Sequence, residues 1–244
     1  MTTSVWASCW RVTLVANGEF RLRVQYGKVG RLRWLSHLEI VHALERAVRR
    51  ARLSYSITYG FSPHMKAAFG PALPVGTAGE NEYYDVWLTR YTSAEELLSL
   101  LVSATPVDLA PSKAGFVPDS QPSLTASLTI AKYVVRVAGK ESQAEKVHAA
   151  LAGLVESGTL HVEHKGKHKV FDLARSLPEE TRVSESAGGS EVVLTVRIGP
   201  EGSLRPETLV RTALESASVD ASVVRVSRTD TLVESEGDVW ARPL

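Results

Sequence analysis

The chain has 244 residues, 44% of them hydrophobic and 23% charged, and its formal net charge is +1 at pH 7. These values are ordinary for a soluble globular protein of one or two domains and argue against a disordered or membrane-spanning chain. Cys9 is the only cysteine, so the sequence offers no internal disulfide, no cysteine-based zinc site and no iron–sulfur cluster. The amino terminus lacks the basic region of a signal peptide, and we expect a cytoplasmic protein.

The near-neutral total hides a basic region between Arg21 and Arg52. It contains nine Lys and Arg residues against Glu39 and Glu45, a local excess of seven positive charges. A basic region on an otherwise neutral chain favours a polyanionic or acidic partner.

The first half of the chain contains several predicted strands. Alternating polarity over residues 20–26 predicts a half-buried strand whose outward face carries Arg21 and Arg23. Further strands are expected over residues 53–58, 83–89 and 107–117, with a helix after a capping box at Thr92 and Glu95.

The best-defined helix lies inside the basic region. Ser36 and Glu39 form a capping box, so the helix begins at about His37. Apolar residues from Leu38 onward are expected on one broad face, which packs on the core. The opposite face is cationic and carries His42, Arg46, Arg49, Arg50 and Arg52.

The second half repeats this order of elements. The polar segment 118–127 is the predicted boundary between halves. Strands are expected over residues 128–137, 160–173, 191–198 and 219–227, with helices after a capping box at Ser142 and near Pro206.

This order predicts an α+β protein made of tandem ferredoxin-like (βαββαβ) repeats with antiparallel sheets. The predicted domains are residues 18–118 and 128–233, with terminal extensions 1–17 and 234–244, the latter a mobile tail. The alternative is one continuous α+β domain in which the second half adds strands to the first sheet.

The loop GFSPHMK over residues 60–66 is the most unusual peptide of the chain. Pro63 favours a turn, and His64 and Lys66 then present an imidazole and an ammonium group. Such a loop can hold a phosphate or position a general base. In the alternative, it is an ordered loop with Phe61 and Met65 packed beneath it.

Two histidines are candidates for catalysis. His64 is the first, because of its loop. His37 is the second, although it projects into the apolar face of its helix, where a core histidine bonded to the backbone is the competing interpretation.

A second basic segment, HKGKHK, lies near residue 165 in the second half. His161, His164 and His168 raise the question of a metal site, but the surrounding composition favours strands and a turn, and we predict no metal. Lys165 and Lys167 suit either a polyanion-binding segment or a solvated hairpin.

Aromatic residues are interleaved with the basic ones, as in proteins that stack RNA bases. Tyr26, Trp34, Tyr55 and Tyr59 are the candidates, with burial in the core as the alternative. The sequence has no dinucleotide fingerprint, phosphate loop or zinc-protease motif, so no cofactor is predicted. The predicted nucleic-acid-binding residues are Arg31, Arg33, Arg46, Arg49, Arg50, His64, Lys66, Lys165 and Lys167.

Three segments together resemble a bacterial family of radical-SAM-associated proteins of unknown function. They are GRLRWLSHLE (30–39), ALERA with two following arginines (43–50), and YGFSPH through PALPVG (59–76). Weaker similarities lie at residues 171–173, 205–207 and 228–232. The chain departs from the family pattern at Glu39, Met65 and Ala174, which places a second-half site in more doubt than the first-half loop.

The resemblance implies a radical SAM partner enzyme, often with a cobalamin-type domain, and a context of RNA processing. The leading hypothesis is therefore an accessory module that binds RNA, or an RNA-bearing substrate, for that enzyme. The alternatives are a metal-independent ribonuclease with a His general acid or base, and a protein-interaction domain that binds no nucleic acid.

Overall fold

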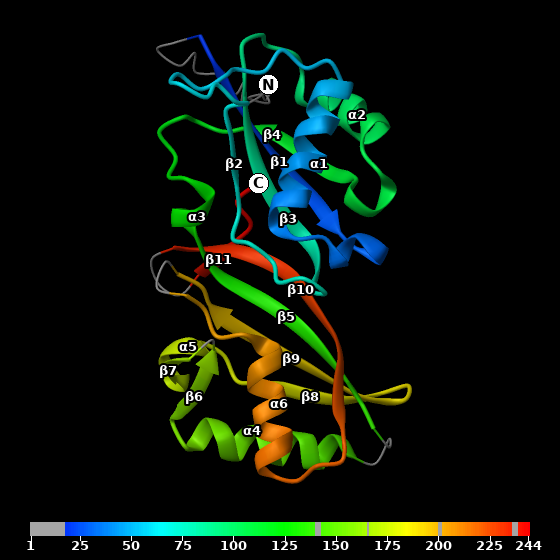
Figure 1. The fold of residues 1–244 in the computed structure, drawn as a ribbon, viewed down its shortest axis with the longest axis vertical. Helices are drawn as coiled ribbons and strands as arrows, with labels where there is room; N and C mark the ends of the chain where they lie inside the picture. The colour runs from blue at the N-terminus through cyan, green and yellow to red at the C-terminus, as the bar shows by residue number, and fades with distance from the viewer. Residues whose placement is uncertain (1–17, 140–142, 165, 200–201, 236–238) are drawn as a thin grey trace, which may run out of the picture.

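The computed structural model describes residues 18–139, 143–164, 166–199, 202–235 and 239–244 (Figure 1). Within these residues, strands from both halves form one nine-stranded, largely antiparallel sheet, accompanied by six α-helices. In Figure 1, α1 and α2 lie in front of the upper part of the sheet and α6 lies in front of its lower part.

In the first half, β1 pairs with β3 and β4, and β2 pairs with β3, all antiparallel. The order across this part of the sheet is β4-β1-β3-β2. The elements are β1 (Phe20–Lys28), η1 (Gly30–Trp34), α1 (His37–Arg50), β2 (Ala67–Phe69), β3 (Ala78–Leu88), α2 (Ala94–Ala104), η2 (Val107–Leu109) and β4 (Pro111–Phe116).

In the second half, the order across the sheet is β10-β5-β9-β8. The hairpin of β6 and β7 forms a separate two-stranded sheet between α4 and β8 in the chain. The elements are α3 (Leu124–Ser127), β5 (Leu128–Ala138), α4 (Ala144–Glu156), β6 (Thr159–His164), β7 (Lys167–Asp172), α5 (Leu173–Ser176), β8 (Arg182–Ser186), β9 (Gly189–Arg197), α6 (Pro206–Ser216), β10 (Ser222–Ser235) and β11 (Val239–Ala241).

Strand β3 joins the halves because two strands share one of its edges. Residues 84–86 pair with β2, whereas Ala78 and Gly79 pair in parallel with Ser227 and Arg228 of β10. The second half thus adds its strands to the first sheet, as in the continuous-domain alternative. Independent folding of the halves stays a prediction.

Helix α1 begins where the sequence predicts. The Ser36 hydroxyl accepts from the Glu39 N–H at 3.4 Å, and the Ser36 N–H donates to the Glu39 carboxylate at 2.8 Å, which confirms the capping box. Ile40 and Leu44 lie on the buried face. Leu38 does not: its side chain is 68% exposed, because at about 100° per residue it lies on the opposite side of the helix from Ile40.

Several predicted boundaries in the first half are wrong. Residues 53–58 make only isolated bridges, at Tyr55 and Ile57, and the second strand is β2. The cap of α2 is Ser93, which accepts from the Glu96 N–H at 3.2 Å and displaces the box expected at Thr92. A short 3-10 turn occupies the start of the predicted strand 107–117, so β4 is shorter.

Two expectations concern the second half and the carboxyl terminus. Ser142 lies outside the described residues, and α4 begins after Gln143 without a side-chain cap. The prediction of a mobile tail is wrong for residues 239–244, since β11 pairs with β10 and the Arg242 guanidinium bonds Asp230 at 2.8 Å.

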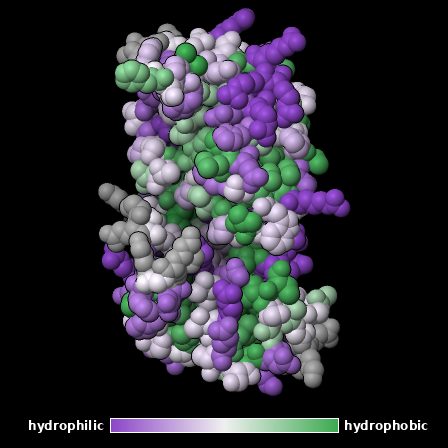
Figure 2. Space-filling view, in the orientation of Figure 1, coloured by the Kyte–Doolittle hydropathy of each residue, from purple (hydrophilic) through white to green (hydrophobic). Residues whose placement is uncertain are grey.

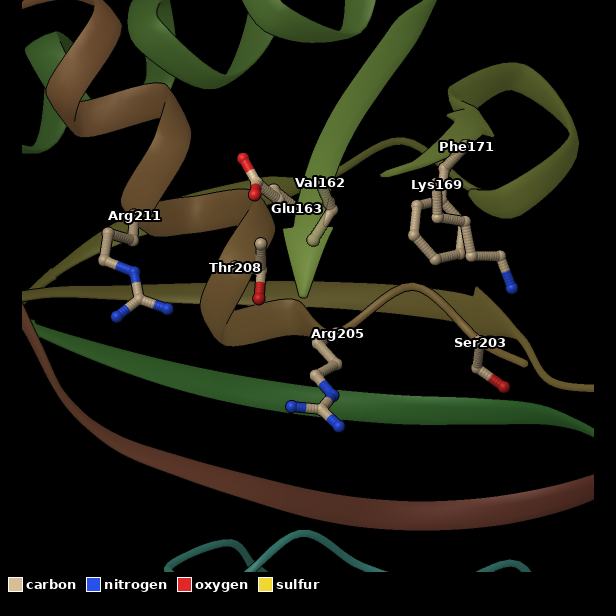
Figure 3. Close-up of a pocket in the computed structure, with 8 residues that line it drawn as sticks. All are labelled: Val162, Glu163, Lys169, Phe171, Ser203, Arg205, Thr208 and Arg211. Carbon is tan, nitrogen blue, oxygen red and sulfur yellow. The ribbon is translucent and has the colours of Figure 1, made fainter. Parts of the chain in front are cut away.

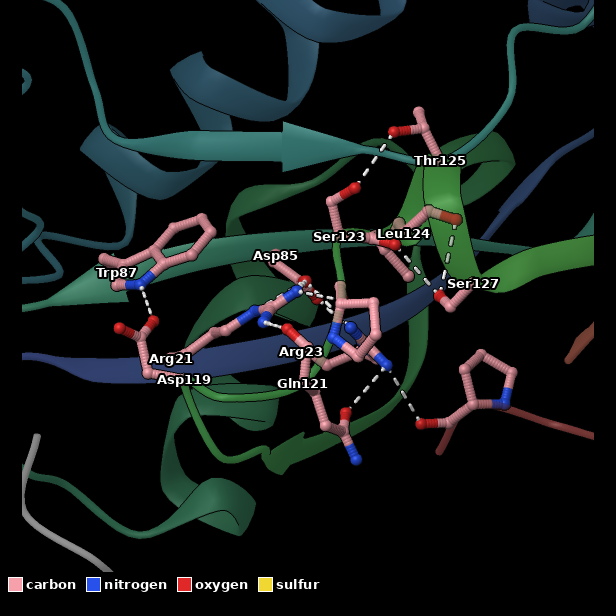
Figure 4. A network of polar contacts seen from close by, with 12 residues as sticks. Arg21, Arg23, Asp85, Trp87, Asp119, Gln121, Ser123, Leu124, Thr125 and Ser127 are labelled. Atoms are coloured by element: carbon pink, nitrogen blue, oxygen red, sulfur yellow. Dashed lines mark hydrogen bonds and ion pairs between the residues drawn. The ribbon is translucent and has the colours of Figure 1, made fainter. Parts of the chain in front are cut away.

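The outward face predicted for Arg21 and Arg23 is wrong, because both side chains are buried. They share the carboxylate of Asp85 on the neighbouring strand, at 2.6–2.9 Å (Figure 4). Arg21 also donates to the carbonyls of Gln121 and Pro122 at 2.7 and 3.1 Å. The segment between the halves therefore covers this face of the sheet. Its carbonyls accept from guanidinium N–H groups that the single Asp85 carboxylate does not bond.

The first testable prediction concerns this network. Asp85→Ala leaves two buried guanidinium groups without their carboxylate, so the free energy of unfolding should fall by about 3–5 kcal/mol, measured by denaturant titration. The matched control is Glu191→Ala, which removes the partner of the exposed Arg136 and should cost about 1 kcal/mol or less. Equal, small effects would contradict the role of Asp85.

Candidate nucleic-acid interface

The basic region is divided by the fold into buried and exposed cations. Arg21, Arg23 and Lys28 are buried and cannot contact a polyanion at the surface. Of the other six, Arg33 is half-buried and the rest are exposed: Arg31, Arg46, Arg49, Arg50 and Arg52. The surface charge is therefore smaller than the sequence suggests and concentrates near the carboxyl end of α1.

The exposed face of α1 is the main cationic surface. Figure 2 shows hydrophilic side chains gathered over the upper part of α1. Arg49 lies 3.3 Å from Glu45, one helical turn back, and bonds Tyr55. The bond with Tyr55 raises the pKa of Arg49. Partial burial lowers this pKa and the charge of Glu45 raises it, so Arg49 keeps its charge at every ordinary pH.

After α1, the chain forms a hairpin whose arms are joined by backbone bonds. The Lys66 N–H donates to the Ser56 carbonyl at 2.8 Å, and the Thr58 N–H donates to the His64 carbonyl at 2.8 Å. Met65 is buried at the base, but Tyr59 and Phe61 at the tip are fully exposed. The alternative in which both side chains pack beneath the loop is therefore wrong for Phe61, although Met65 is buried.

His64 and Lys66 have different environments. The Nδ1 atom of His64 lies 3.0 Å from the Thr58 hydroxyl and 3.1 Å from the Ser62 carbonyl, contacts that orient the ring within its own loop. Lys66 pairs with Glu19 at 2.5 Å and lies over the Trp87 ring. Lys66 is thus already neutralised, and His64 is the more accessible of the two.

Arg31 and Arg33 lie in η1, before α1 and away from the hairpin. The Arg33 guanidinium lies over the Trp34 ring, 5.2 Å from its centroid. Trp34 also packs against Gly76, where an added Cβ would come within 2.9 Å of the ring. The predicted binding residues of the first half therefore divide between two ends of α1.

The other predicted stacking aromatics have mixed outcomes. Tyr26 is buried and packs edge-on against Tyr84, so it is a core residue. Tyr55 is half-buried, whereas Trp34 and Tyr59 are exposed.

The basic segment of the second half lies in the β6–β7 hairpin. Lys165 lies outside the described residues, and Lys167 opens β7. Lys169, farther along β7, lines a cavity of about 330 Å³ with Arg205 and Arg211 beside α6 (Figure 3). Among the described residues, no three His, Cys, Asp or Glu side chains are placed to hold a metal ion.

A buried charge cluster lies where the halves meet. Arg228 of β10 donates to the Glu82 carboxylate at 2.5 and 2.8 Å and to the Pro71 carbonyl at 2.6 Å. Burial opposes its charge, but Glu82 and Tyr133 outweigh burial and raise its pKa. Lys28 is buried nearby with only a long 3.5 Å bond to the Pro74 carbonyl, and burial lowers its pKa.

His37 lies at the edge of this cluster. Its ring meets the Phe69 ring edge-on, with centroids 6.2 Å apart. Burial, followed by the charges of Lys28 and Arg228, holds its pKa below the ordinary value, and Glu82 opposes this only partly. His37 is thus a half-buried histidine of the junction, apart from His64.

Sequence reasoning missed the carboxylates that organise the charges. The predicted strand 83–89 contains Asp85, whereas Glu82 lies at the end of the loop before it, and neither acid is predicted to have a role. Arg228 lies in a segment of weak similarity. An acid within the apolar run YYDVW was a usable signal, because a charge there needs a buried partner. Its partners become identifiable only when the strand register pairs Arg23 with Asp85.

A protein-family model described as "Uncharacterized protein conserved in bacteria (DUF2344)" matches residues 21–206, more than half of the chain. No curated protein matches the sequence. No helix in the described parts of the chain is long and apolar enough to cross a bilayer.

Solved structures that align with this chain include a Cbf5-Nop10-Gar1 complex, at 13% identity and a TM-score of 0.48, covering 86% of this chain and 48% of that chain. An H/ACA RNP bound to a substrate RNA containing 2'-deoxyuridine gives 11% identity, a TM-score of 0.47 and coverage of 86% and 47%. An unknown protein from Galdieria sulphuraria aligns at 17% identity and a TM-score of 0.26. This alignment covers 86% of this chain and 98% of that chain. The chain spans about half the length of the first two of these chains.

The second testable prediction concerns His37. Because its pKa is lowered in the folded state, the unfolded chain binds a proton first as pH falls. Stability is then fully present above about pH 6.5 and is lost as pH falls through the folded pKa. His37→Gln should flatten the free energy of unfolding against pH in this window, measured by urea titration. An NMR titration placing His37 at or above its ordinary pKa would contradict this prediction.

Proposed function

This chain belongs to the bacterial family whose model it matches, and we propose that it binds single-stranded RNA as an accessory to a radical SAM enzyme. The observation that carries the RNA part is the placement of two fully exposed aromatic side chains, Tyr59 and Phe61, on a hairpin that follows the cationic face of α1. Cations hold phosphates and exposed aromatics stack unpaired bases, so this pairing suits a single strand.

The connection between the two parts of the surface is direct. The hairpin begins at the carboxyl end of α1, and Arg49 bonds Tyr55 in its first arm. An RNA backbone bound by Arg46, Arg49 and Arg50 therefore lies on the helix that directly precedes the hairpin with the exposed rings. His64 sits on the same hairpin and can donate to a phosphate.

The radical SAM partner rests on the resemblance of the motif segments and on the single cysteine, which leaves cluster chemistry to another protein. The exposed Trp34, Leu38 and Val75 supply a specific reason to consider protein docking as a second function. Their segments touch, since the Gly76 N–H donates to the Arg33 carbonyl at 2.9 Å. This apolar surface is a candidate contact for the enzyme.

A ribonuclease is the less favoured reading of the same hairpin. The described contacts of His64 are the Thr58 hydroxyl and neighbouring backbone, and none is a carboxylate that would assist proton transfer. We also propose that each half is a ferredoxin-like unit. The matching orders β4-β1-β3-β2 and β10-β5-β9-β8, with β6–β7 as an insertion, support this assignment.

The third testable prediction concerns the arginines. Wild-type protein should bind a fluorescent single-stranded RNA with an affinity that falls by roughly 0.7 log units per log unit of salt for each phosphate neutralised. Arg46→Glu with Arg49→Glu should lower affinity by about tenfold or more and reduce that slope. The matched control, Arg182→Glu with Arg225→Glu, changes two exposed arginines of the second half and should have little effect.

The result that would contradict RNA binding is equally specific. If the wild-type protein binds no RNA at low salt, and the arginine pair matters only for association with a radical SAM enzyme, the cationic face is a protein interface. RNA cleavage by wild type that His64→Ala removes, with unchanged binding, would favour the ribonuclease.

The fourth testable prediction concerns the aromatic tip. Tyr59→Ala with Phe61→Ala should weaken RNA binding by about 1–3 kcal/mol for each stacked base lost. The salt slope should stay that of wild type, because no charge changes. Both side chains are exposed, so thermal unfolding should not shift. Unaltered affinity would show that the tip does not contact bases.

A further inference from the structure

A second site lies at the junction of the halves, away from the hairpin and from the carboxyl end of α1. It is a cavity of about 420 Å³ between the loop after β2, the strands of the second half and the start of α6. This volume lies in the usual range of small-molecule sites. Its apolar walls are Pro71, Leu73, Pro74, Tyr133, Ile198 and Val226.

The polar groups of this cavity include one buried side chain with spare bonding capacity. Thr77 lines the cavity and is only 6% exposed, yet its hydroxyl has no hydrogen-bond partner among the described residues. A ligand in the cavity can therefore bond this hydroxyl without breaking a hydrogen bond within the protein.

Groups that can bind an anion also line this cavity. The Arg205 guanidinium is exposed, forms no ion pair with a described residue, and extends from the start of α6 toward β5 and β10 (Figure 3). Helix α6 begins at Pro206 without a side-chain cap, so the N–H groups of Glu207 and Thr208 are open to an acceptor. The Glu207 carboxylate also lines the cavity but lies 3.8 Å from Arg211.

The second guanidinium of this cavity is already paired within the protein. Arg228 lines the cavity, but its guanidinium already bonds Glu82, Pro71 and Tyr133. Among the described residues that line the cavity, Arg205 is therefore the cation without a carboxylate partner, and an anionic group is favoured beside it.

We propose that this cavity binds a small phosphorylated molecule with a flat or apolar body, of the size of a mononucleotide. The phosphate lies between Arg205 and the start of α6, the body lies against Tyr133 and the proline walls, and Thr77 bonds a polar atom of the ligand. Arg205 and Thr77 are separate from the proposed RNA surface, so either proposal can fail alone.

The test uses the full-length protein with AMP, UMP, adenosine and inorganic phosphate as probes in calorimetric titrations. AMP or UMP should bind more tightly than adenosine or phosphate alone. Arg205→Gln should weaken nucleotide binding by roughly 10- to 100-fold, and Thr77→Val by about tenfold. Arg182→Gln, at an exposed arginine of β8 that does not line this cavity, is the matched control and should change affinity less than twofold.

Thermal unfolding of each variant checks that the fold is retained, and Arg205→Gln, at an exposed position, decides the matter if Thr77→Val is unstable. Equal affinity for adenosine and AMP would overturn the phosphate assignment. No binding of either nucleotide at millimolar concentration, or unchanged binding by Arg205→Gln, would overturn the site.

Discussion

Strand β3 carries the two carboxylates on which the assembly of the chain depends. Asp85 holds Arg21 and Arg23 on one side of the sheet, and Glu82 holds Arg228 of the second half. Each guanidinium is buried, so its charge is tolerated only because a carboxylate and backbone carbonyls face it. The same pairs bring the segment between the halves, the carboxyl-terminal residues and β10 onto the first sheet.

These pairs also explain which cations remain for function. A count of charges along the sequence treats Arg21 and Arg46 alike. In the structure, Arg21 is buried in the sheet and paired with Asp85, whereas Arg46 is exposed at the surface. The proposed RNA binding therefore depends on the exposed face of α1 and on the hairpin that follows it. The sheet supplies a rigid base, and the exposed groups lie on the elements that it positions.

Local signals in the sequence identified most elements. The capping box at Ser36 and the alternation over residues 20–26 predicted α1 and β1, because both features depend on neighbours within a few residues. The face on which Arg21 points was mistaken, because a strand covered on both sides has no outward face to read. The exposure of Phe61 was likewise unpredictable, since it depends on how far the hairpin extends past β3. The junction cavity combines Thr77 with Arg205, which no local pattern connects.

The contact between β3 and β10 has a mechanical consequence. Only Ala78 and Gly79 of β3 are in register with β10, so the backbone ladder across the middle of the sheet is short. Side chains bridge the same line: Asn81 donates to the Thr229 carbonyl at 2.6 Å, and the Thr231 hydroxyl donates to the Asn81 carbonyl at 3.1 Å. The two halves are therefore joined across this line mainly by side chains, among them the Arg228–Glu82 pair, so that removing these side chains would leave a ladder of two residue pairs to hold β10 on β3.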